Sequence, residues 1–335
     1  MWVAGTDGAT SNVFYFVFSG GSMTGYTDPS TGKMYYYYSG GGSPSTPGTI
    51  HSLNADGTPD ATYGPFLQGS PAFTFDPGTG YVFLTDGSGI NVNVLKNPSL
   101  AYNIPVGEVA AFDTNSGLVC AVQPNTDTAY CFMAAGVSTS VVVATIGFPK
   151  GSQPAAVKVF PDGSIVVFTR GNSTLSWFAI SGSTATPTGT LVLPEFTNAD
   201  ATYWQTYHWT GGGNMVLVNG TLGVMGYVVN ADGTVSQKLA LVDIAAHTVN
   251  QYADLPAGTV FLAADPTNNA IVAEYPDFSV SPPVTRFERI YVDTGNATTL
   301  TSTSTLVPGA AIFVTQGGNN ILICVSGGCD LQPNQ

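Results

Sequence analysis

The chain carries little charge, and this scarcity excludes several kinds of partner. Lys and Arg together number 8 in 335 residues, against 21 Asp and Glu, so the formal net charge is −13. A surface with so few cations cannot neutralise a phosphate backbone, which excludes nucleic acid as a partner. Anionic membrane surfaces are disfavoured for the same reason.

Long apolar runs and catalytic side chains are scarce as well. No apolar run approaches the roughly 18 residues of a membrane-spanning helix, so we expect no membrane span. The three His residues have no metal-ligand spacing, and no Gly-x-Ser-x-Gly motif occurs. Lys158 is the one charged residue on the strands that we assign to the interior. These absences predict no metal, no cofactor and no catalytic residues.

The residues that are abundant predict an all-β fold. The chain has 40 Gly and 22 Pro, and hydrophobic residues make up 44% of it. Gly and Pro favour turns, whereas the Val-, Thr- and Phe-rich runs between them are typical of short strands. Aromatic residues make up 11%, enough to bury a large core.

A tight turn between two apolar runs recurs along the chain. The turns are placed near residues 28, 76, 113, 161, 210, 265 and 316, so their spacing is 37 to 55 residues. A repeat of this length with strands on both sides predicts a seven-bladed β-propeller with four strands in each blade.

The two ends of the chain predict how the ring closes. Two apolar runs, Trp2–Ala4 and Val13–Phe18, precede the first turn, and one strand, Asn320–Val325, follows the last. We therefore expect N- and C-terminal strands to share one blade, which would close the ring and leave no sheet edge open. Residues 1–335 would then form a single propeller domain.

Four of the turns share a sequence pattern close to Asp-Pro-x-Thr-Gly, at Asp28, Asp76, Asp113 and Asp265. The pattern resembles the repeat of the YVTN/YncE-like, lactonase-like group of seven-bladed propellers. The resemblance implies blade geometry, in a group that includes enzymes, binding proteins and structural proteins. We interpret each Asp as a cap of its own turn, because an Asp side chain readily bonds to backbone amides two residues on.

The four Cys residues occur as two local pairs. If the hairpin at 118–132 turns between Asn125 and Thr126, then Cys120 lies directly opposite Cys131, within disulfide range. Cys324 and Cys329 flank a Gly-rich loop that can close a second bridge. Two disulfides would indicate an oxidising compartment and hence a secreted or cell-surface protein. The alternative is four buried thiols.

The densest aromatic segment is Tyr203–Trp209, which we place on an innermost strand before the fifth turn. We interpret Trp204, Tyr207 and His208 as candidate ligand-binding residues, an aromatic platform that would stack a sugar or another planar ligand. The alternative is aromatic packing between blades.

Charged residues gather in the sixth repeat. Arg286, Glu288 and Arg289 lie close to Glu274 and Asp277, which predicts an ion-pair network on the solvated side of one blade. Three Asn-x-Ser/Thr triplets begin at Asn172, Asn219 and Asn296, and they permit glycosylation without requiring it.

Together these features favour a secreted or cell-surface, non-enzymatic propeller that acts as an interaction, adhesion or assembly module. Its partner would be a protein or a carbohydrate, with self-assembly as a further possibility. Two alternatives stay open: a lactonase- or lyase-type enzyme with its site at the central channel mouth, and a sugar-binding lectin.

Overall fold

The computed structural model describes most of the chain as antiparallel β-structure. The described residues are 23–28, 31–39, 48–66, 73–76, 78–85, 89–106, 109, 111–115, 117–134, 140–197, 215–259, 261–302, 311–315, 320–325 and 328–333. Within them one short 3₁₀ helix, Pro124–Thr126, interrupts the strands. The predicted all-β class is confirmed.

The strands form seven antiparallel sheets, each built from strands that are consecutive in the chain. The first three sheets contain β1 (Met23–Thr27), β2 (Met34–Ser39), β3 (Gly48–Leu53) and β4 (Pro59–Phe66); β5 (Phe73–Asp76), β6 (Tyr81–Thr85), β7 (Ile90–Val94) and β8 (Asn97–Ile104); and β9 (Ala111–Asn115), β10 (Leu118–Gln123), β11 (Thr128–Ala134) and β12 (Ser140–Gly147). The next two contain β13 (Pro154–Val159), β14 (Ser164–Thr169), β15 (Thr174–Ser181) and β16 (Thr184–Val192); and β17 (Met215–Val218), β18 (Thr221–Val229), β19 (Val235–Asp243) and β20 (Thr248–Leu255). The last two contain β21 (Phe261–Asp265), β22 (Ala270–Asp277), β23 (Val284–Tyr291) and β24 (Ala297–Ser302); and β25 (Ala311–Val314), β26 (Asn320–Val325) and β27 (Gly328–Pro333).

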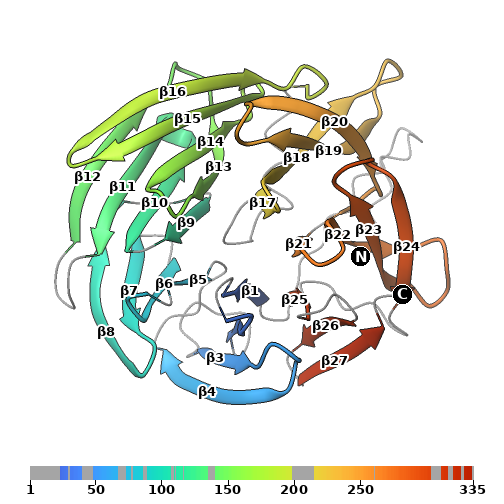
Figure 1. Cartoon of the computed structure of the whole chain (residues 1–335), viewed down its shortest axis with the longest axis horizontal. Coiled ribbons are helices and arrows are strands. Elements are labelled where there is room, and N and C mark those ends of the chain that lie inside the picture. The colour runs from blue at the N-terminus through green and yellow to red at the C-terminus, as the bar shows by residue number, and fades with distance from the viewer. Residues whose placement is uncertain are drawn as a thin grey trace, which may run out of the picture.

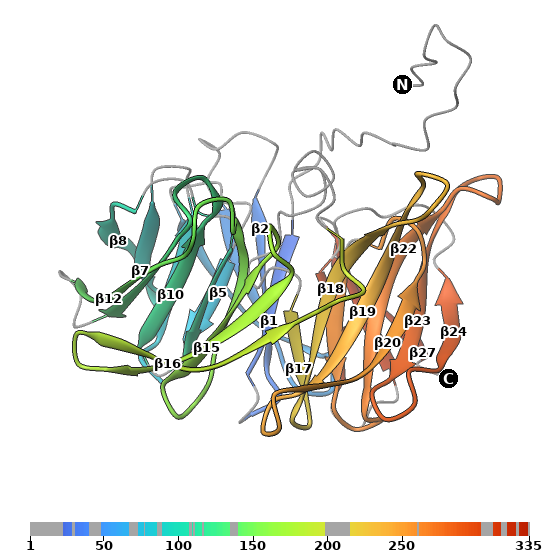
Figure 2. The ribbon, with the colours of Figure 1, turned by 90° about the horizontal axis from the view of Figure 1, so that it is seen from above.

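The sheets are arranged radially, with the first strand of each nearest the common axis (Figure 1). Each innermost strand contacts the innermost strands of two neighbouring sheets, and β25 contacts both β21 and β1. Seen edge-on, the strands run between two faces of the ring (Figure 2). We call the face that carries the turns between first and second strands the first-turn face.

Six of the sheets are complete four-stranded blades, and the last has three described strands. The predicted β-propeller is therefore confirmed, but the predicted count of seven four-stranded blades is not, because six are complete. The first described strand, β1, pairs with β2 in a blade of its own and does not complete the last sheet. The runs Trp2–Ala4 and Val13–Phe18, which were expected to do so, lie outside the described residues.

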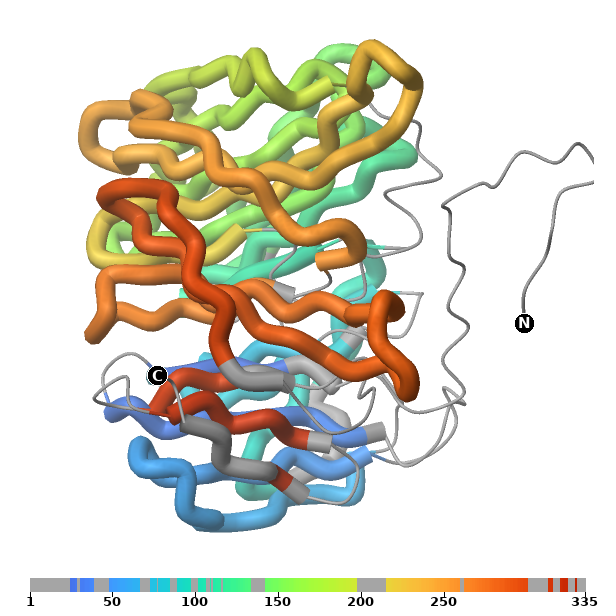
Figure 3. The backbone as a smooth tube through the Cα atoms, turned by 90° about the vertical axis from the view of Figure 1, so that its right-hand side faces the viewer, coloured from blue at the N-terminus to red at the C-terminus, as the bar shows by residue number. Residues whose placement is uncertain are grey.

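The core is divided among the junctions between neighbouring sheets. Figure 3, which views the ring from one side, shows neighbouring sheets lying one above another. One apolar cluster fills each of the seven junctions, including the junction that joins Phe313 and Leu322 of the last sheet to Met34 of the first blade. Middle strands such as β10 are buried along their whole length, because both of their faces pack against neighbouring sheets. Outermost strands such as β16 alternate between exposed and half-buried residues, as strands with one solvated face do.

The fifth turn was predicted in the wrong place. The innermost strand of the fifth blade is β17, and it turns into β18 at Asn219 and Gly220, not at Thr210–Gly213. Both turn residues have positive φ, 46° at Asn219 and 86° at Gly220, a conformation that Asn and Gly adopt most readily. The Gly-rich run looked more like a turn, but the chain reverses where the backbone needs two left-handed residues in succession.

Candidate functional site

The repeated Asp residues of the first turns are buried, and two of them, Asp76 and Asp113, connect neighbouring blades. Asp76 is 2% exposed, and its carboxylate accepts a hydrogen bond from the backbone N–H of Gly78 in its own turn. Its second oxygen accepts one from the N–H of Gly117, in the first turn of the next blade. The predicted capping role is correct for Asp76 but incomplete, because the same carboxylate also holds the adjacent blade.

Asp113 connects the third blade to the fourth in the same way. Its Oδ2 accepts a hydrogen bond from the N–H of Val159 at 2.8 Å and lies 3.0 Å from Nζ of Lys158. Asp113 is 5% exposed, so the contact lies largely out of water. Lys158, the one cation expected on an innermost strand, therefore pairs with a carboxylate of the adjacent blade.

The third and fourth blades are also connected at the opposite end of their strands. Asp127 lies in the turn between β10 and β11, and its two carboxylate oxygens accept hydrogen bonds from the N–H groups of Gly151 and Gln153, both at 2.7 Å. This junction is therefore tied by carboxylates at both faces of the ring.

Near the axis, the negative charges of three first-turn carboxylates act on the phenol of Tyr26. Burial raises the pKa of the Tyr26 hydroxyl, and the negative charges of Asp28, Asp113 and Asp76 raise it further. The Tyr26 ring also packs edge-on against Phe75, with ring centroids 6.1 Å apart. Because Tyr26 stays neutral and the carboxylates accept structural hydrogen bonds, this cluster is a scaffold at the first-turn face.

A groove opens between the third and fourth blades. It encloses about 370 Å³ and is lined by apolar side chains of both blades, with one carboxylate at Asp162. The lining includes Leu118, Met133, Val143, Phe160 and Ile180. Met133 is 38% exposed, so this apolar lining reaches solvent. We call this site the blade-3/4 groove.

Asp162 is the charged group of the blade-3/4 groove. Hydrogen bonds from the hydroxyl and the N–H of Ser164 to its Oδ1 lower the pKa of the Asp162 carboxyl, so it is ionised at neutral pH. No cation is among the described residues that line the groove. The site therefore combines an apolar floor with a negative charge at its edge.

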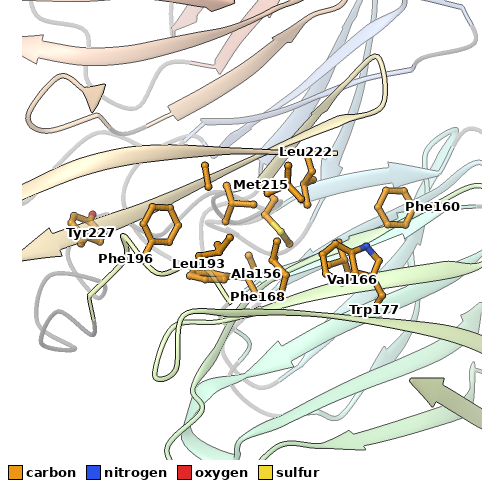
Figure 4. Close-up of a cluster of buried hydrophobic side chains, with 14 residues drawn as sticks. Ala156, Phe160, Val166, Phe168, Trp177, Leu193, Phe196, Met215, Leu222 and Tyr227 are labelled. Atoms are coloured by element: carbon orange, nitrogen blue, oxygen red, sulfur yellow. The ribbon is translucent and has the colours of Figure 1, made fainter. Parts of the chain in front are cut away.

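The junction between the fourth and fifth blades is apolar by contrast. A cluster that includes Phe168, Trp177, Phe196 and Met215 fills it (Figure 4). The ring of His247 stacks on Trp177, with centroids 4.2 Å apart and planes 17° apart. This packing makes the junction a structural element of the ring.

Both predicted disulfides are present. Cys120 and Cys131 are directly opposed on β10 and β11, with Cα atoms 4.1 Å apart, and Cys324 and Cys329 are opposed on β26 and β27. No free Cys remains. The first disulfide lies in the apolar cluster between the third and fourth blades, so it stiffens the wall behind the blade-3/4 groove.

The predicted ligand-binding residues Trp204, Tyr207 and His208 lie outside the described residues, and their role stays a prediction. The other two His residues are in structural contacts. His51 stacks on Tyr36 at 4.9 Å, and both of its ring nitrogens lie within hydrogen-bond distance of Thr hydroxyls, those of Thr49 and Thr62. Burial lowers the pKa of His51.

The predicted ion-pair network of the sixth blade is only partly correct. Arg286 pairs with Asp277, as expected, whereas Arg289 is buried and lies 3.4 Å from Asp265. Glu274 is 1% exposed, and neither of its oxygens has a hydrogen-bond partner among the described residues. The expectation of a solvated position for Glu274 is wrong, because the residue lies on the face of β22 that packs against the last sheet.

Two absences concern the described part of the chain. Within it, no group of three or more His, Cys, Asp or Glu side chains could hold a metal ion. No helix in that part has the length and apolar character to cross a membrane.

The chain is similar in fold to several solved propellers. It matches the β-propeller domain of Cps50 (Swd1) from Myceliophteria thermophila with 10% identity and a TM-score of 0.59, covering 95% of this chain and 98% of that one. A 6-phosphogluconolactonase-like propeller from Bacteroides uniformis gives 11% identity and a TM-score of 0.58, covering 85% and 86%. The WD40 domain of Toxoplasma gondii coronin gives 12% identity and a TM-score of 0.55, covering 90% and 77%.

No family model matches the chain, and no curated protein matches its sequence. At these identities the likeness to solved structures shows the fold alone: the molecule is a β-propeller. The propeller part of the expected resemblance is thus confirmed, and membership of the YVTN/YncE-like group stays a prediction.

Proposed function

We propose that this chain is a non-enzymatic interaction module, secreted or displayed on the cell surface, which binds a protein partner through the blade-3/4 groove. The observation that carries the proposal is the groove itself, an apolar concavity of about 370 Å³ between two blades that are tied together at both faces. Concave apolar sites on rigid walls are typical of binding sites. WD40 propellers are among the structural neighbours that share the β-propeller fold.

The partner would contribute an apolar side chain to the groove and a basic group to its edge. Leu118, Met133 and Phe160 offer apolar surface, and Asp162 offers one ionised carboxylate. The net charge of −13 favours association with a cationic partner over a large part of the surface. The two disulfides support a location in an oxidising compartment.

A matched pair of variants tests the proposal. Met133→Glu places a charge in the groove, whereas Val229→Glu places the same charge at another exposed apolar residue, 42% exposed, in the fifth blade. Each biotinylated variant serves as bait for chemical cross-linking, and the amount of cross-linked partner is measured. We expect this amount to fall at least tenfold for Met133→Glu and to be unchanged for Val229→Glu. Equal capture by both variants would refute the groove as the binding site.

A catalytic role is tested separately. Turnover of lactones or esters by the wild-type protein, lost on His208→Ala, would overturn the non-enzymatic proposal. Trp204, Tyr207 and His208 are still proposed as ligand-binding residues, and binding of a soluble sugar that is lost on Trp204→Ala would favour the lectin alternative.

We also propose that an N-terminal strand completes the last sheet, so that residues 1–335 form one closed domain of seven blades. Three observations support this: the last sheet has three described strands, its outermost strand β27 pairs with β26, and apolar clusters join the sheet to both neighbours. Deletion of residues 1–18 should speed hydrogen exchange of the β27 amides. Exchange that is unchanged after the deletion would contradict this closure.

A further inference from the structure

The three Asn-x-Ser/Thr triplets of the chain occupy different environments in the fold. Asn219 lies in the first turn of the fifth blade, and its Nδ2 donates hydrogen bonds to the carbonyl of Pro266 at 2.8 Å and to Oδ1 of Asn269 at 3.1 Å. Both acceptors belong to the first turn of the sixth blade. A sugar takes the place of one of the two Nδ2 hydrogens, so a glycan on Asn219 would remove one of these two contacts between blades.

The triplet at Asn172 is folded into a tight turn between β14 and β15. Oδ1 of Asn172 accepts a hydrogen bond from the Thr169 hydroxyl at 2.5 Å, and the Thr174 hydroxyl donates to the carbonyl of Asn172. The middle residue, Ser173, is 7% exposed and has a φ of 51°. The side chains that define this triplet are therefore engaged within the turn.

The triplet at Asn296 is open. Asn296, Ala297 and Thr298 are all exposed, where the turn after β23 leads into the outermost strand β24. The backbone N–H of Asn296 donates to the Thr294 hydroxyl, but neither its side-chain amide nor the Thr298 hydroxyl has a hydrogen-bond partner among the described residues. A large polar substituent could project from this edge into solvent without displacing any described contact.

We propose that Asn296 is an N-glycan acceptor of this protein and that Asn219 is not. In the modification, Nδ2 of Asn296 attacks the anomeric carbon of a lipid-diphosphate-linked oligosaccharide. The new N–C bond forms, the C–O bond to the diphosphate breaks, and the amide loses one proton. The inference rests on the export proposed above, because the donor is available only in a secretory compartment.

The position of Asn296 is compatible with binding at the blade-3/4 groove. Asn296 immediately precedes β24, which lies across the ring from β12 and β16 of the third and fourth blades (Figure 1). A glycan there would cover the outer edge of the sixth blade and leave the groove open to a partner.

Three Thr→Ala variants test the proposal, because each removes one triplet and keeps its Asn in place. The full chain, with a cleavable export signal, is secreted from yeast as wild type, Thr174→Ala, Thr221→Ala and Thr298→Ala. Intact mass is measured before and after peptide-N-glycosidase, which converts a glycosylated Asn to Asp and so marks the site. We expect a glycan on Asn296 in the wild type, Thr174→Ala and Thr221→Ala, and no glycan in Thr298→Ala. A further variant, Asn296→Gln, should lack the glycan as well.

The outcomes separate this inference from the export on which it rests. The Asn296 assignment is overturned if the secreted protein has both disulfides but no glycan. It is also overturned if the glycan persists in Thr298→Ala. Neither outcome contradicts the proposed export. A folded secreted form with Asp at position 219 after the enzyme treatment overturns the exclusion of Asn219. Free thiols in the yeast-expressed protein would contradict the two disulfides on which the proposed export rests.

Discussion

Two buried carboxyl groups of this propeller have opposite surroundings. Asp113 ends up between the third and fourth blades, where its Oδ2 accepts the N–H of Val159 and faces the ammonium group of Lys158. Glu274 lies between the sixth blade and the last sheet, on the same face of the blade as Val272 and Phe287, with no hydrogen-bond partner among the described residues. Both side chains are almost fully buried.

The difference shows how the fold uses its few charges. A buried carboxylate is stable when donors replace the water that it loses, and it then becomes a specific contact between two sheets. Without donors the neutral acid is favoured, and burial raises the pKa of Glu274 to about 8. Asp113 thus positions one blade against another, whereas Glu274 makes the stability of its junction depend on pH.

The largest effect is expected from Glu274→Gln, which removes the ionisation. In the folded protein the pKa of Glu274 is about 8, above its ordinary value of 4.5. The folded state is therefore most stable below pH 4.5, where the acid is neutral, and its stability falls as the pH rises to 8. At pH 7 the variant should be more stable by about 3 kcal/mol, since each pKa unit corresponds to about 1.4 kcal/mol. At pH 4 the two proteins should be equally stable.

Urea unfolding at pH 4, 7 and 8 measures this effect. The nearest charged groups on the same face, Asp265 and Arg289, pair with each other at 3.4 Å and stay in place in the variant. A wild-type stability that does not fall between pH 4.5 and 8 relative to Glu274→Gln would show that Glu274 has a donor in the native protein.

The next effect is expected from Asp113→Ala, which breaks the partnered site. The substitution leaves the buried N–H of Val159 without its acceptor and Lys158 without its carboxylate. Unfolding free energy should fall by about 2–3 kcal/mol, a value reduced because Lys158 is partly exposed to water. Asp254→Ala is the control, because Asp254 has a side chain that is 87% exposed, and its unfolding midpoint in urea should stay near that of the wild type.

The side-chain contacts of this propeller could be predicted from the sequence only in part. The sequence predicts Cys120 opposite Cys131, because a hairpin fixes its own register by its turn. It also predicts that Asp76 caps its turn, since the Asp side chain reaches amides two residues away. Local geometry is enough for both.

The remaining contacts depend on how separate blades meet. The bond from Gly117 to Asp76 joins residues 41 positions apart, and no local pattern gives the offset between neighbouring sheets. Glu274 looked solvated because charged residues surround it in sequence, but alternation along β22 places it beside Val272 on the buried face. The fifth turn was misplaced because Gly211–Gly213 is a stronger turn signal than Asn219–Gly220, where the hairpin actually forms.

The smallest effect, and the sharpest test of the comparison, is expected from Lys158→Met. The variant removes the cation from Asp113 but leaves the hydrogen bond from Val159, and Met keeps most of the apolar stem of Lys158. If backbone donors are what stabilise the buried carboxylate, the unfolding free energy should fall by about 1 kcal/mol or less. If the ion pair is the main contribution, Lys158→Met should lower the unfolding free energy as much as Asp113→Ala does. The double variant Asp113→Ala/Lys158→Met should then be no less stable than either single variant. Measuring all three by urea unfolding gives the coupling between the two side chains directly.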